Sequence, residues 1–200
     1  MSEGSPAPPD EKLTRSERIN IRISVTQTVL AIVGIFIGSV ALYAALSESE
    51  EVRKQTEASV WPRVGIGHNR SEAPGAEMME FIVANYGIGP AVVKGAKVTI
   101  DGKAHKSWFD VIQTATGAES PPIRNASFGR AVIPARESTV VLHMENEVAA
   151  ELNRLARANQ LDIEICYCSV FDQCWLVRYS KADAAPVQAC PDYGDEAFAQ

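Results

Sequence analysis

The chain has 200 residues of average composition, with 46% hydrophobic residues, 22% charged residues and a formal net charge of −6. This composition excludes an intrinsically disordered chain, and the length fits one ordinary domain with additional segments or two very small domains. The acidic balance argues against nucleic-acid binding, because affinity for phosphate backbones comes mainly from clustered Lys and Arg, so we expect no nucleic-acid partner. Acidic and basic residues balance before residue 23, so residues 48–200 carry the whole net charge.

The N-terminal segment, residues 1–22, is polar and includes a short Pro-rich stretch at residues 5–10. Short polar segments of this composition bury too little apolar surface to become ordered. We therefore expect residues 1–22 to form a disordered tail.

Residues 23–47 contain no charged side chain over 25 consecutive positions. As a helix they would span about 37 Å, which exceeds the hydrocarbon core of a bilayer at about 30 Å. A buried core helix is one alternative, although a soluble domain of this size rarely hides a helix that is apolar all round. A cleaved signal peptide is another, with Ala45-Leu46-Ser47 as a passable cleavage site, but the apolar core of such peptides is usually about 7–15 residues. The length therefore favours a retained transmembrane helix over residues 23–47, surrounded by the lipid bilayer.

The charged residues on the two sides of this helix indicate its orientation. The bases Lys12, Arg15, Arg18 and Arg22 precede it, and the acids Glu48, Glu50 and Glu51 follow it ahead of Arg53 and Lys54. Because basic residues are retained on the cytoplasmic side, this distribution predicts a cytoplasmic N-terminal tail and an exported C-terminal domain.

Small or polar residues form one stripe along the expected transmembrane helix, at alternating spacings of three and four positions. The stripe consists of Ser24, Gln27, Ala31, Gly34, Gly38, Ala41 and Ala45. Hydrophobicity does not drive helices together in lipid, whereas small residues allow close backbone contact, and Gly34-x-x-x-Gly38 lies in the middle of the stripe. Because Gly and Ala are frequent in any transmembrane helix, a stripe without a partner is the alternative. The pattern predicts self-association or packing against the transmembrane helix of another protein.

Residues 48–59 lack Gly and Pro and are rich in helix formers, so we expect the helix to continue as a polar stalk that Pro62 stops. Beyond the stalk, apolar and polar residues alternate as in half-buried strands. The expected strands are residues 60–66, 79–86, 92–101, 130–133, 138–144, 161–169 and 175–180. In the strand at residues 138–144, we expect Val140, Leu142 and Met144 to point inward.

Two short helices interrupt these strands. Their apolar faces consist of Trp108, Val111 and Ile112 in the first helix and of Val148, Leu152 and Leu155 in the second. Asn146 fits the N-cap of the second helix, and Asn159 fits its C-terminal end. Six or seven short strands with few helices are typical of an immunoglobulin-like sandwich of two sheets. We therefore predict a β-sandwich with two short helices over residues 60–182 and a tail at residues 183–200.

Short motifs follow the expected membrane helix and stalk in a distinctive order. They are Ser59-Val60-Trp61-Pro62, Asn85-Tyr86-Gly87-Ile88-Gly89-Pro90-Ala91, Asp101-Gly102, Ile165-Cys166-Tyr167-Cys168-Ser169 and Cys174-Trp175. This order resembles a group of bacterial single-pass membrane proteins of uncharacterised function, in which a helix runs into an SVxP strand start and an N-x-G-x-GPA loop follows. The resemblance covers roughly residues 25–180. It implies a β-domain anchored in the bacterial inner membrane and exposed to the periplasm, and it implies no catalytic residue.

The loop at residues 85–91 also has a physical interpretation. Gly87 and Gly89 permit positive φ angles, Pro90 fixes the exit of the chain, and Asn85 can bond the backbone of the turn. These properties indicate a structural role, with a binding role as the alternative.

All four cysteines lie within 25 residues, in the part of the chain expected to be exported. An even count on the oxidising side of a membrane predicts two disulfides, for which three connectivities exist. Cys166 and Cys168 share one face of their strand, and Cys174 follows the turn beside Cys168. We expect Cys168–Cys174 to close the hairpin and Cys166–Cys190 to fasten the tail. The alternative is zinc binding or redox cycling, but zinc sites usually pair C-x2-C units and reactive thiol pairs usually lie at helix N-termini.

The sequence contains no familiar catalytic motif. His68, His105 and His143 are scattered and form no HExxH pattern. We therefore expect no catalytic residue, no metal site and no cofactor. We predict an accessory subunit or sensor that acts through protein contacts, because the expected membrane helix carries a small-residue stripe and the β-domain lacks a recognisable group of catalytic residues. Two alternatives remain, namely a thiol-redox or metal-binding protein built on the four cysteines and a ligand-binding receptor domain.

Overall fold

The computed structural model describes residues 14–119 and 121–199, and the chain divides into two compact units, Met1–Lys54 and Gln55–Gln200. We refer to the second unit as the β-domain. Residues 1–13 of the expected tail lie outside the described residues.

Helix α1 (Arg15–Ser59) makes up the described part of the first unit and ends in the β-domain. The prediction of a disordered tail is wrong for residues 15–22, which are helical, because Thr14 and Glu17 cap the helix. The Glu17 carboxylate accepts hydrogen bonds from the backbone N–H and the hydroxyl of Thr14, both at 2.7 Å. The helix is long and apolar enough to cross a membrane, as membrane anchors and signal sequences are. All seven residues of the small-residue stripe lie within α1.

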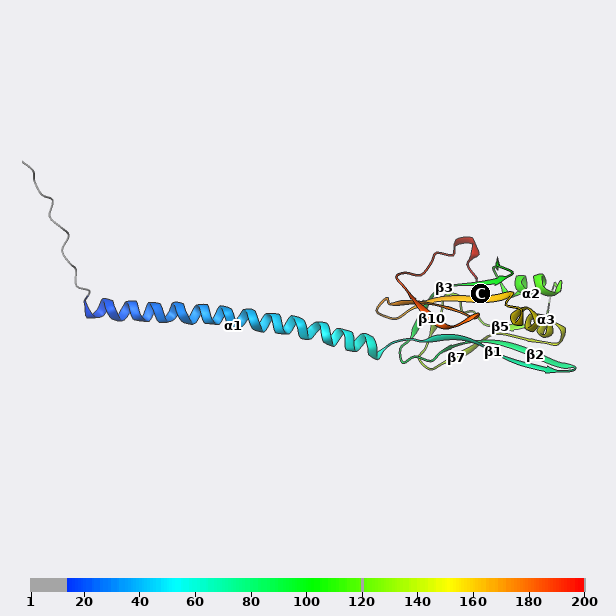
Figure 1. The fold of residues 1–200 in the computed structure, drawn as a ribbon, viewed down its shortest axis with the longest axis horizontal. Helices are drawn as coiled ribbons and strands as arrows, with labels where there is room; N and C mark the ends of the chain where they lie inside the picture. The colour runs from blue at the N-terminus through cyan, green and yellow to red at the C-terminus, as the bar shows by residue number, and fades with distance from the viewer. Residues whose placement is uncertain (1–13, 120, 200) are drawn as a thin grey trace, which may run out of the picture. The chain divides into compact units, whose positions relative to one another are not determined.

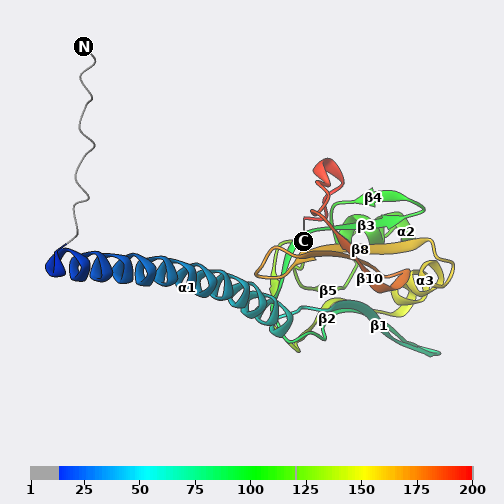
Figure 2. The same cartoon turned by 60° about the vertical axis from the view of Figure 1, so that its left-hand side comes forward.

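The β-domain is mainly β and contains two antiparallel sheets (Figure 1). One sheet has the strand order β1-β2-β7-β5, and the other has the order β10-β9-β8-β3-β4 with β6 paired to β3. The strands are β1 (Val64–Ala73), β2 (Ala76–Asn85), β3 (Ala91–Ile100), β4 (Lys103–His105), β5 (Arg124–Asn125), β6 (Val132–Ile133), β7 (Ser138–Glu145), β8 (Leu161–Cys168), β9 (Cys174–Arg178) and β10 (Lys181–Val187). The sheets form two layers, and helices α2 (Trp108–Thr116) and α3 (Asn146–Arg157) lie together at one end (Figure 2).

Apolar side chains from both sheets and both short helices share one core. Successive residues of strand β8 point alternately toward the core and away from it. The odd-numbered residues from Leu161 to Tyr167 are all buried in this core. The Tyr167 hydroxyl accepts a hydrogen bond from the backbone N–H of Val64 at 3.2 Å, which joins β8 to the start of β1 across the layers. Each sheet therefore buries one face against the other.

The observed strands correct several expectations. Strand β1 begins at Val64 rather than at residue 60 and extends to Ala73, and β4, β5 and β10 were not expected. Val140 points outward and is 41% exposed, whereas Val141 is buried. The reason is a register shift in the pairing of β2 with β7, where Phe81 faces Leu142 and Ile82 faces Val140. This shift is a β-bulge, which adds one residue to β7. The side chains on one side of the bulge therefore point to the opposite faces of the sheet from those expected.

The two predicted short helices correspond to α2 and α3. The Ser107 side chain caps α2 by accepting a hydrogen bond from the backbone N–H of Asp110 at 3.2 Å. In α3 the N-cap is Glu145 rather than Asn146, which has a positive φ of 58° and is already the first helical residue. Asn159 follows the end of α3 with φ of 55°, and the backbone N–H of Gln160 donates to the Leu155 carbonyl at 2.9 Å. This hydrogen bond is the signature of a Schellman motif at the helix end.

The C-terminal segment is part of the β-domain. Strand β10 pairs with β9, and Phe198 is buried in the core. The backbone N–H of Phe198 donates to the Ala96 carbonyl of β3, at 2.9 Å. The expected boundary between domain and tail at residue 183 therefore has no structural counterpart.

Candidate functional site

The loop at residues 86–90 holds the segment between the end of α1 and the start of β1. The backbone N–H of Tyr86 donates to the Arg63 carbonyl at 2.8 Å, and the N–H of Ile88 donates to the Trp61 carbonyl at 3.0 Å. The SVWP and NYGIGPA motifs therefore form one junction, because each provides hydrogen-bonding partners for the other.

Asn85 is the centre of this junction and is buried, with 1% of its surface exposed. Its Oδ1 accepts hydrogen bonds from the backbone N–H groups of Arg63 and Gly87, both at 3.0 Å. Its Nδ2 donates to the carbonyls of Gly89 at 2.8 Å and Ile133 at 3.1 Å. One side chain thus joins the segment before β1, the loop and β6 with four hydrogen bonds, which satisfies its full donor capacity.

The interpretation of the two loop glycines from sequence is wrong. Positive φ angles occur at Gly75, Gly102, Gly117 and Gly194 in the described chain, and not at Gly87 or Gly89. A Cβ on Gly87 would lie 2.4 Å from the Trp61 carbonyl oxygen, and a Cβ on Gly89 would lie 1.7 Å from the Val60 carbonyl oxygen. These glycines are required because the junction backbone passes directly against the loop.

An aromatic cleft of about 480 Å³ opens beside the junction. Its lining comes from the last turn of α1, the junction, the loop and strands β8–β10, and consists of Ala58, Trp61, Pro62, Arg63, Tyr86, Gly87, Ile88, Tyr167, Trp175, Asp183 and Ala184. The ring centres of Trp61 and Trp175 are 6.2 Å apart, and those of Trp175 and Tyr167 are 5.7 Å apart. Trp61 is 56% exposed and Tyr86 is 70% exposed, so a large aromatic surface of the cleft is open to solvent. We refer to this feature as the aromatic cleft.

Charged and polar groups also line the aromatic cleft. The exposed Arg63 and Asp183 lie at its edges, and Tyr167 forms part of its base. Burial raises the pKa of the Tyr167 hydroxyl, which the hydrogen bond from Val64 and the nearby Arg63 partly oppose. The Tyr167 side chain is therefore neutral at physiological pH, and the cleft combines apolar ring faces with one cation and one anion.

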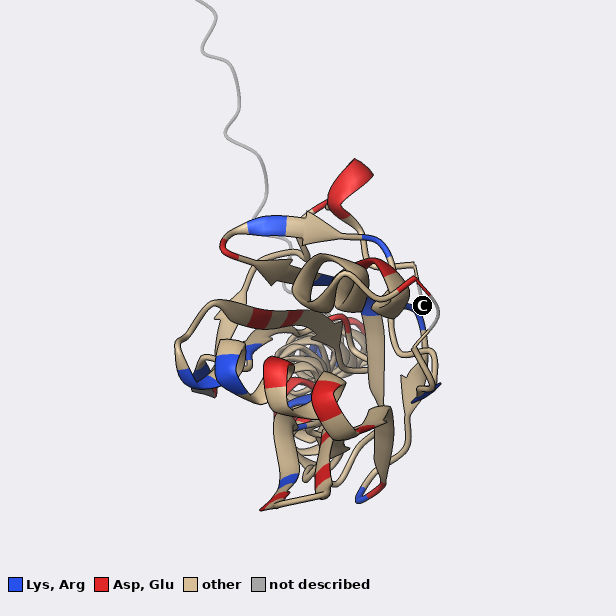
Figure 3. Ribbon diagram, turned by 90° about the vertical axis from the view of Figure 1, so that its right-hand side faces the viewer, with Lys and Arg blue, Asp and Glu red and all other residues tan. Residues whose placement is uncertain are grey.

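Two other exposed apolar side chains, those of Val170 and Phe171, lie in a turn that contacts the end of α1. The exposed large apolar residues of the described β-domain are Trp61, Tyr86, Ile88, Phe109, Val132, Val140, Val170 and Phe171. Val170 and Phe171 lie in the turn after β8, which Gln173 joins to Glu57 of α1 through a hydrogen bond of 3.1 Å. The end of the domain that faces the viewer in Figure 3 instead carries α2 and α3, with residues of both charge signs on α3. The two ends of the domain therefore differ in chemistry.

Comparisons with protein-family models, curated proteins and solved structures find no match to this chain. The resemblance drawn from the motifs therefore stays a prediction.

The four cysteines lie on the opposite face of β8 and β9 from the cleft residues Tyr167 and Trp175. Cys166 is bonded to Cys190 and Cys168 is bonded to Cys174, with S–S distances of 2.12 and 2.09 Å. This is the pairing expected from the strand register. Because every cysteine is in a disulfide, none of them offers a thiolate to a metal in this state.

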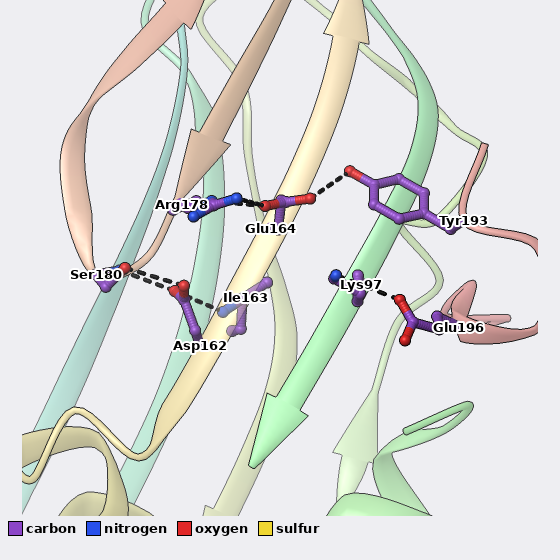
Figure 4. Close-up of polar contacts among 8 residues, drawn as sticks. All are labelled: Lys97, Asp162, Ile163, Glu164, Arg178, Ser180, Tyr193 and Glu196. Atoms are coloured by element: carbon purple, nitrogen blue, oxygen red, sulfur yellow. Dashed lines mark hydrogen bonds and ion pairs between the residues drawn. The ribbon is translucent and has the colours of Figure 1, made fainter. Parts of the chain in front are cut away.

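A polar cluster fastens the C-terminal segment over the same outer face (Figure 4). The buried Glu164 of β8 accepts hydrogen bonds from Arg178 Nε at 2.6 Å and from the Tyr193 hydroxyl at 2.9 Å. Lys97 forms an ion pair with Glu196 at 3.4 Å, and its ammonium lies 5.8 Å from the centre of the Tyr193 ring. Tyr193 packs over Gly95, because a Cβ there would lie 2.9 Å from the ring. We refer to Glu164, Arg178 and Tyr193 as the tyrosine clasp.

The three histidines lie on different strands and have different partners. His68 accepts or donates one hydrogen bond with the Tyr179 hydroxyl at 2.8 Å, and burial together with Arg70 lowers its pKa. His105 is buried with its Nδ1 3.1 Å from Asp110. His143 lies between Glu80 and Glu145, and its hydrogen bond lowers the pKa of Glu80. The structure does not bring the histidines together with one another or with the cysteines.

Sequence reasoning did not find the aromatic cleft. Trp61 and Trp175 are visible in the SVWP and Cys-Trp motifs, but they lie 114 positions apart. The available signal was the position of each Trp beside a strand start, since Trp61 lies three residues before β1 and Trp175 is the second residue of β9. Pairing them required the strand order of both sheets.

Proposed function

We propose that this protein is a single-pass membrane protein whose β-domain acts through protein contacts, as an accessory subunit or sensor, and that the aromatic cleft is its contact site. The observation that carries the proposal is an open cleft of about 480 Å³ in which Trp61 and Tyr86 are more than half exposed. Exposed aromatic clusters of this kind mark contact sites, because Trp and Tyr contribute much of the binding energy in protein interfaces. The proposed location is the bacterial inner membrane, with the N-terminus cytoplasmic and the β-domain in the periplasm.

The strand orders support an immunoglobulin-like arrangement of the β-domain. That fold places strands A, B, E and D in one sheet and C, F and G in the other. The order β1-β2-β7-β5 corresponds to A-B-E-D, and β3-β8-β9 corresponds to C-F-G. Strand β4 extends this second sheet beyond β3, and β10 extends it beyond β9. In such domains, loops at the ends of the sheets form the binding surfaces, which is where the aromatic cleft lies.

The junction connects the proposed contact site to α1. Trp61 lines the cleft while its carbonyl accepts hydrogen bonds from the loop, and Ala58 of the last helical turn lines the same cleft. A partner that moves the Trp61 ring therefore acts on the residues that join the helix to the domain. This arrangement favours a sensor or an accessory subunit over a passive anchor.

Site-specific photocrosslinking tests the contact site. A photoreactive residue at position 86, in the full chain in its native membrane, is expected to form a defined protein adduct that Trp61→Ala reduces about tenfold. Position 109 provides the matched control, because Phe109 is also an exposed aromatic residue but lies on α2. Equal adducts at both positions, or an adduct at position 86 that Trp61→Ala leaves unchanged, would contradict the proposal.

The small-residue stripe is the second proposed contact. Gly34→Ile combined with Gly38→Ile is expected to abolish self-association or partner association in a membrane two-hybrid assay, because the larger side chains separate the helix backbones. Val40→Ile combined with Leu42→Ile alters positions off the stripe and should leave the signal unchanged. An unchanged signal in the glycine variant would exclude helix packing through this face.

A ligand-binding receptor domain is the second candidate function. The cleft volume lies within the range of about 300–1,000 Å³ found for small-molecule sites, and its ring faces with one cation and one anion suit an amphipathic ligand. The crosslinking experiment separates the two candidates. A small ligand would occupy the cleft without forming a protein adduct at position 86.

A further inference from the structure

The two disulfides of the β-domain are in contact with each other. The sulfur of Cys168 lies 3.8 Å from the sulfur of Cys190, to which it is not bonded. The sulfurs of Cys168, Cys174 and Cys190 all lie within 4.8 Å of one another. A thiolate formed at Cys168 would therefore lie against the sulfur of the other disulfide.

The cysteines differ in their access to solvent. Cys166 and Cys168 are buried, with 0% and 2% of their surface exposed, whereas Cys174 and Cys190 are half-buried. Cys174 also follows the exposed turn Val170–Gln173 between β8 and β9. Since thiol–disulfide exchange requires direct attack on a sulfur, a reductant from solvent reaches Cys174 and Cys190 more readily than Cys166 and Cys168.

We propose that the four cysteines form a disulfide-exchange relay, in which reduction of Cys168–Cys174 by an external dithiol is passed on to Cys166. The dithiol, of the C-x-x-C oxidoreductase class or dithiothreitol, first attacks Sγ of Cys174, and Cys168 leaves as a thiolate. The second thiol of the reductant then displaces Cys174. The reductant is thereby oxidised to its disulfide with the loss of two electrons, and Cys168 and Cys174 are reduced.

The second step exchanges one disulfide for another. The Cys168 thiolate attacks Sγ of Cys190, the Cys168–Cys190 bond forms, and the Cys166–Cys190 bond breaks. Cys166 leaves as a thiolate and takes a proton from water. This step involves no net oxidation or reduction, so one dithiol is enough to produce free Cys166 and Cys174 together with a Cys168–Cys190 bond.

The exchange also moves the C-terminal segment. Cys166, Cys168 and Glu164 lie on the same outer face of β8, and the Cys190 sulfur closes from 3.8 Å to a bonding distance of about 2 Å with a partner that lies two residues further from Glu164. Tyr193 follows Cys190 by three residues and is bonded to Glu164, on the other side of Cys166 from Cys168. The exchange thus pulls Cys190 away from the tyrosine clasp. The relay stands independently of what binds the aromatic cleft.

Disulfide mapping of the full chain in detergent or lipid nanodiscs tests the relay. The protein is treated with dithiothreitol in a one-to-one ratio, quenched with a thiol-alkylating reagent, and digested with chymotrypsin. Cleavage after Tyr167 and Phe171 separates Cys166, Cys168 and Cys174 onto different peptides. The expected partly reduced species has Cys166 and Cys174 alkylated and Cys168 linked to Cys190. A partly reduced species with Cys168 and Cys174 alkylated and Cys166–Cys190 intact would overturn the proposal.

Cys168→Ser combined with Cys174→Ser provides the matched control, because it removes both thiols that lie near Cys190 and leaves Cys166–Cys190 in place. Under the same treatment, alkylation of Cys166 is expected to fall about tenfold relative to the unaltered chain. Equal alkylation of Cys166 in both proteins would show direct attack by the reductant and overturn the relay. If the double variant fails to fold, Cys174→Ser alone decides the question, because its unpaired Cys168 should displace Cys166 from Cys190 without any reductant, and an intact Cys166–Cys190 bond would overturn the relay.

Discussion

The β-domain contains two aromatic clusters of similar geometry and opposite exposure. In the sealed cluster, Phe198 lies 5.0 Å from Trp108 and 5.4 Å from Phe128 between ring centres, and all three residues are buried. In the open cluster, Trp175 lies 6.2 Å from Trp61 and 5.7 Å from Tyr167, and Trp61 is largely exposed. The ring spacings alone do not distinguish a core from a contact site.

The two clusters differ in what the chain places over them. Trp108 begins α2, and the C-terminal segment brings Phe198 against it after passing over the outer face of β3 and β8. The junction and the loop lie beside the open cluster, and their backbone groups are already bonded to one another. We infer that rings covered by the chain stabilise the fold, whereas the uncovered rings are available to a partner.

The largest expected effect is the difference between the two tryptophans. Trp108→Ala should lower the free energy of unfolding by about 4 kcal/mol, because it removes a fully buried ring and leaves a cavity. Trp61→Ala should lower it by less than about 1 kcal/mol, because most of that ring is already in water. Urea unfolding of the two variants, followed by circular dichroism, measures both values. Similar losses would show that the open cluster is a structural core.

The second effect concerns the junction beside the open cluster. Gly89→Ala should lower the free energy of unfolding by about 2–3 kcal/mol, because the added Cβ would overlap the Val60 carbonyl and force the junction away from the loop. Gly67→Ala is the matched control in β1, where a Cβ meets no atom within 4 Å and the backbone φ is not positive. Its stability should change by less than about 0.5 kcal/mol. A tolerated Gly89→Ala in the same urea titration would contradict the close contact of the two motifs.

The sequence predicts the features that depend on neighbouring residues. The alternation along residues 161–169 was enough to place Cys166 and Cys168 on one face and the apolar side chains on the other. The Asp101-Gly102 pair was enough to predict the tight turn between β3 and β4, where both residues have positive φ. Periodicity and turn chemistry are local properties, so they can be read from a short stretch of chain.

The features that were missed depend on distant segments. The bulge that turns Val140 outward arises from pairing with β2, and the requirement for Gly89 arises from Val60. Phe198 looked like part of a polar tail because its ring partners, Trp108 and Phe128, lie at least 70 positions earlier. The aromatic cleft combines five separate segments, so no single window of sequence contains it.

The smallest expected effect concerns the tyrosine clasp, which holds the C-terminal segment that leads to the sealed cluster. Tyr193→Phe removes the hydrogen bond to the Glu164 carboxylate and should lower the free energy of unfolding by about 1–2 kcal/mol at pH 7. Tyr86→Phe is the matched control, because that side chain is 70% exposed and should change stability little.

The pH dependence tests the hydrogen bond of Tyr193 directly, because Tyr193→Phe keeps the ring that packs over Gly95. Burial and the hydrogen bond to Glu164 raise the pKa of Tyr193 above the value of about 10 in the unfolded chain. A group whose pKa is raised by folding contributes its stability fully below the unfolded pKa and loses it as the pH rises above that value. The stability difference between the unaltered chain and Tyr193→Phe should therefore be constant from pH 7 to about 9 and shrink above pH 10. A difference that persists unchanged at pH 10.5 would mean that folding does not raise the pKa of Tyr193 and would contradict the hydrogen bond to Glu164.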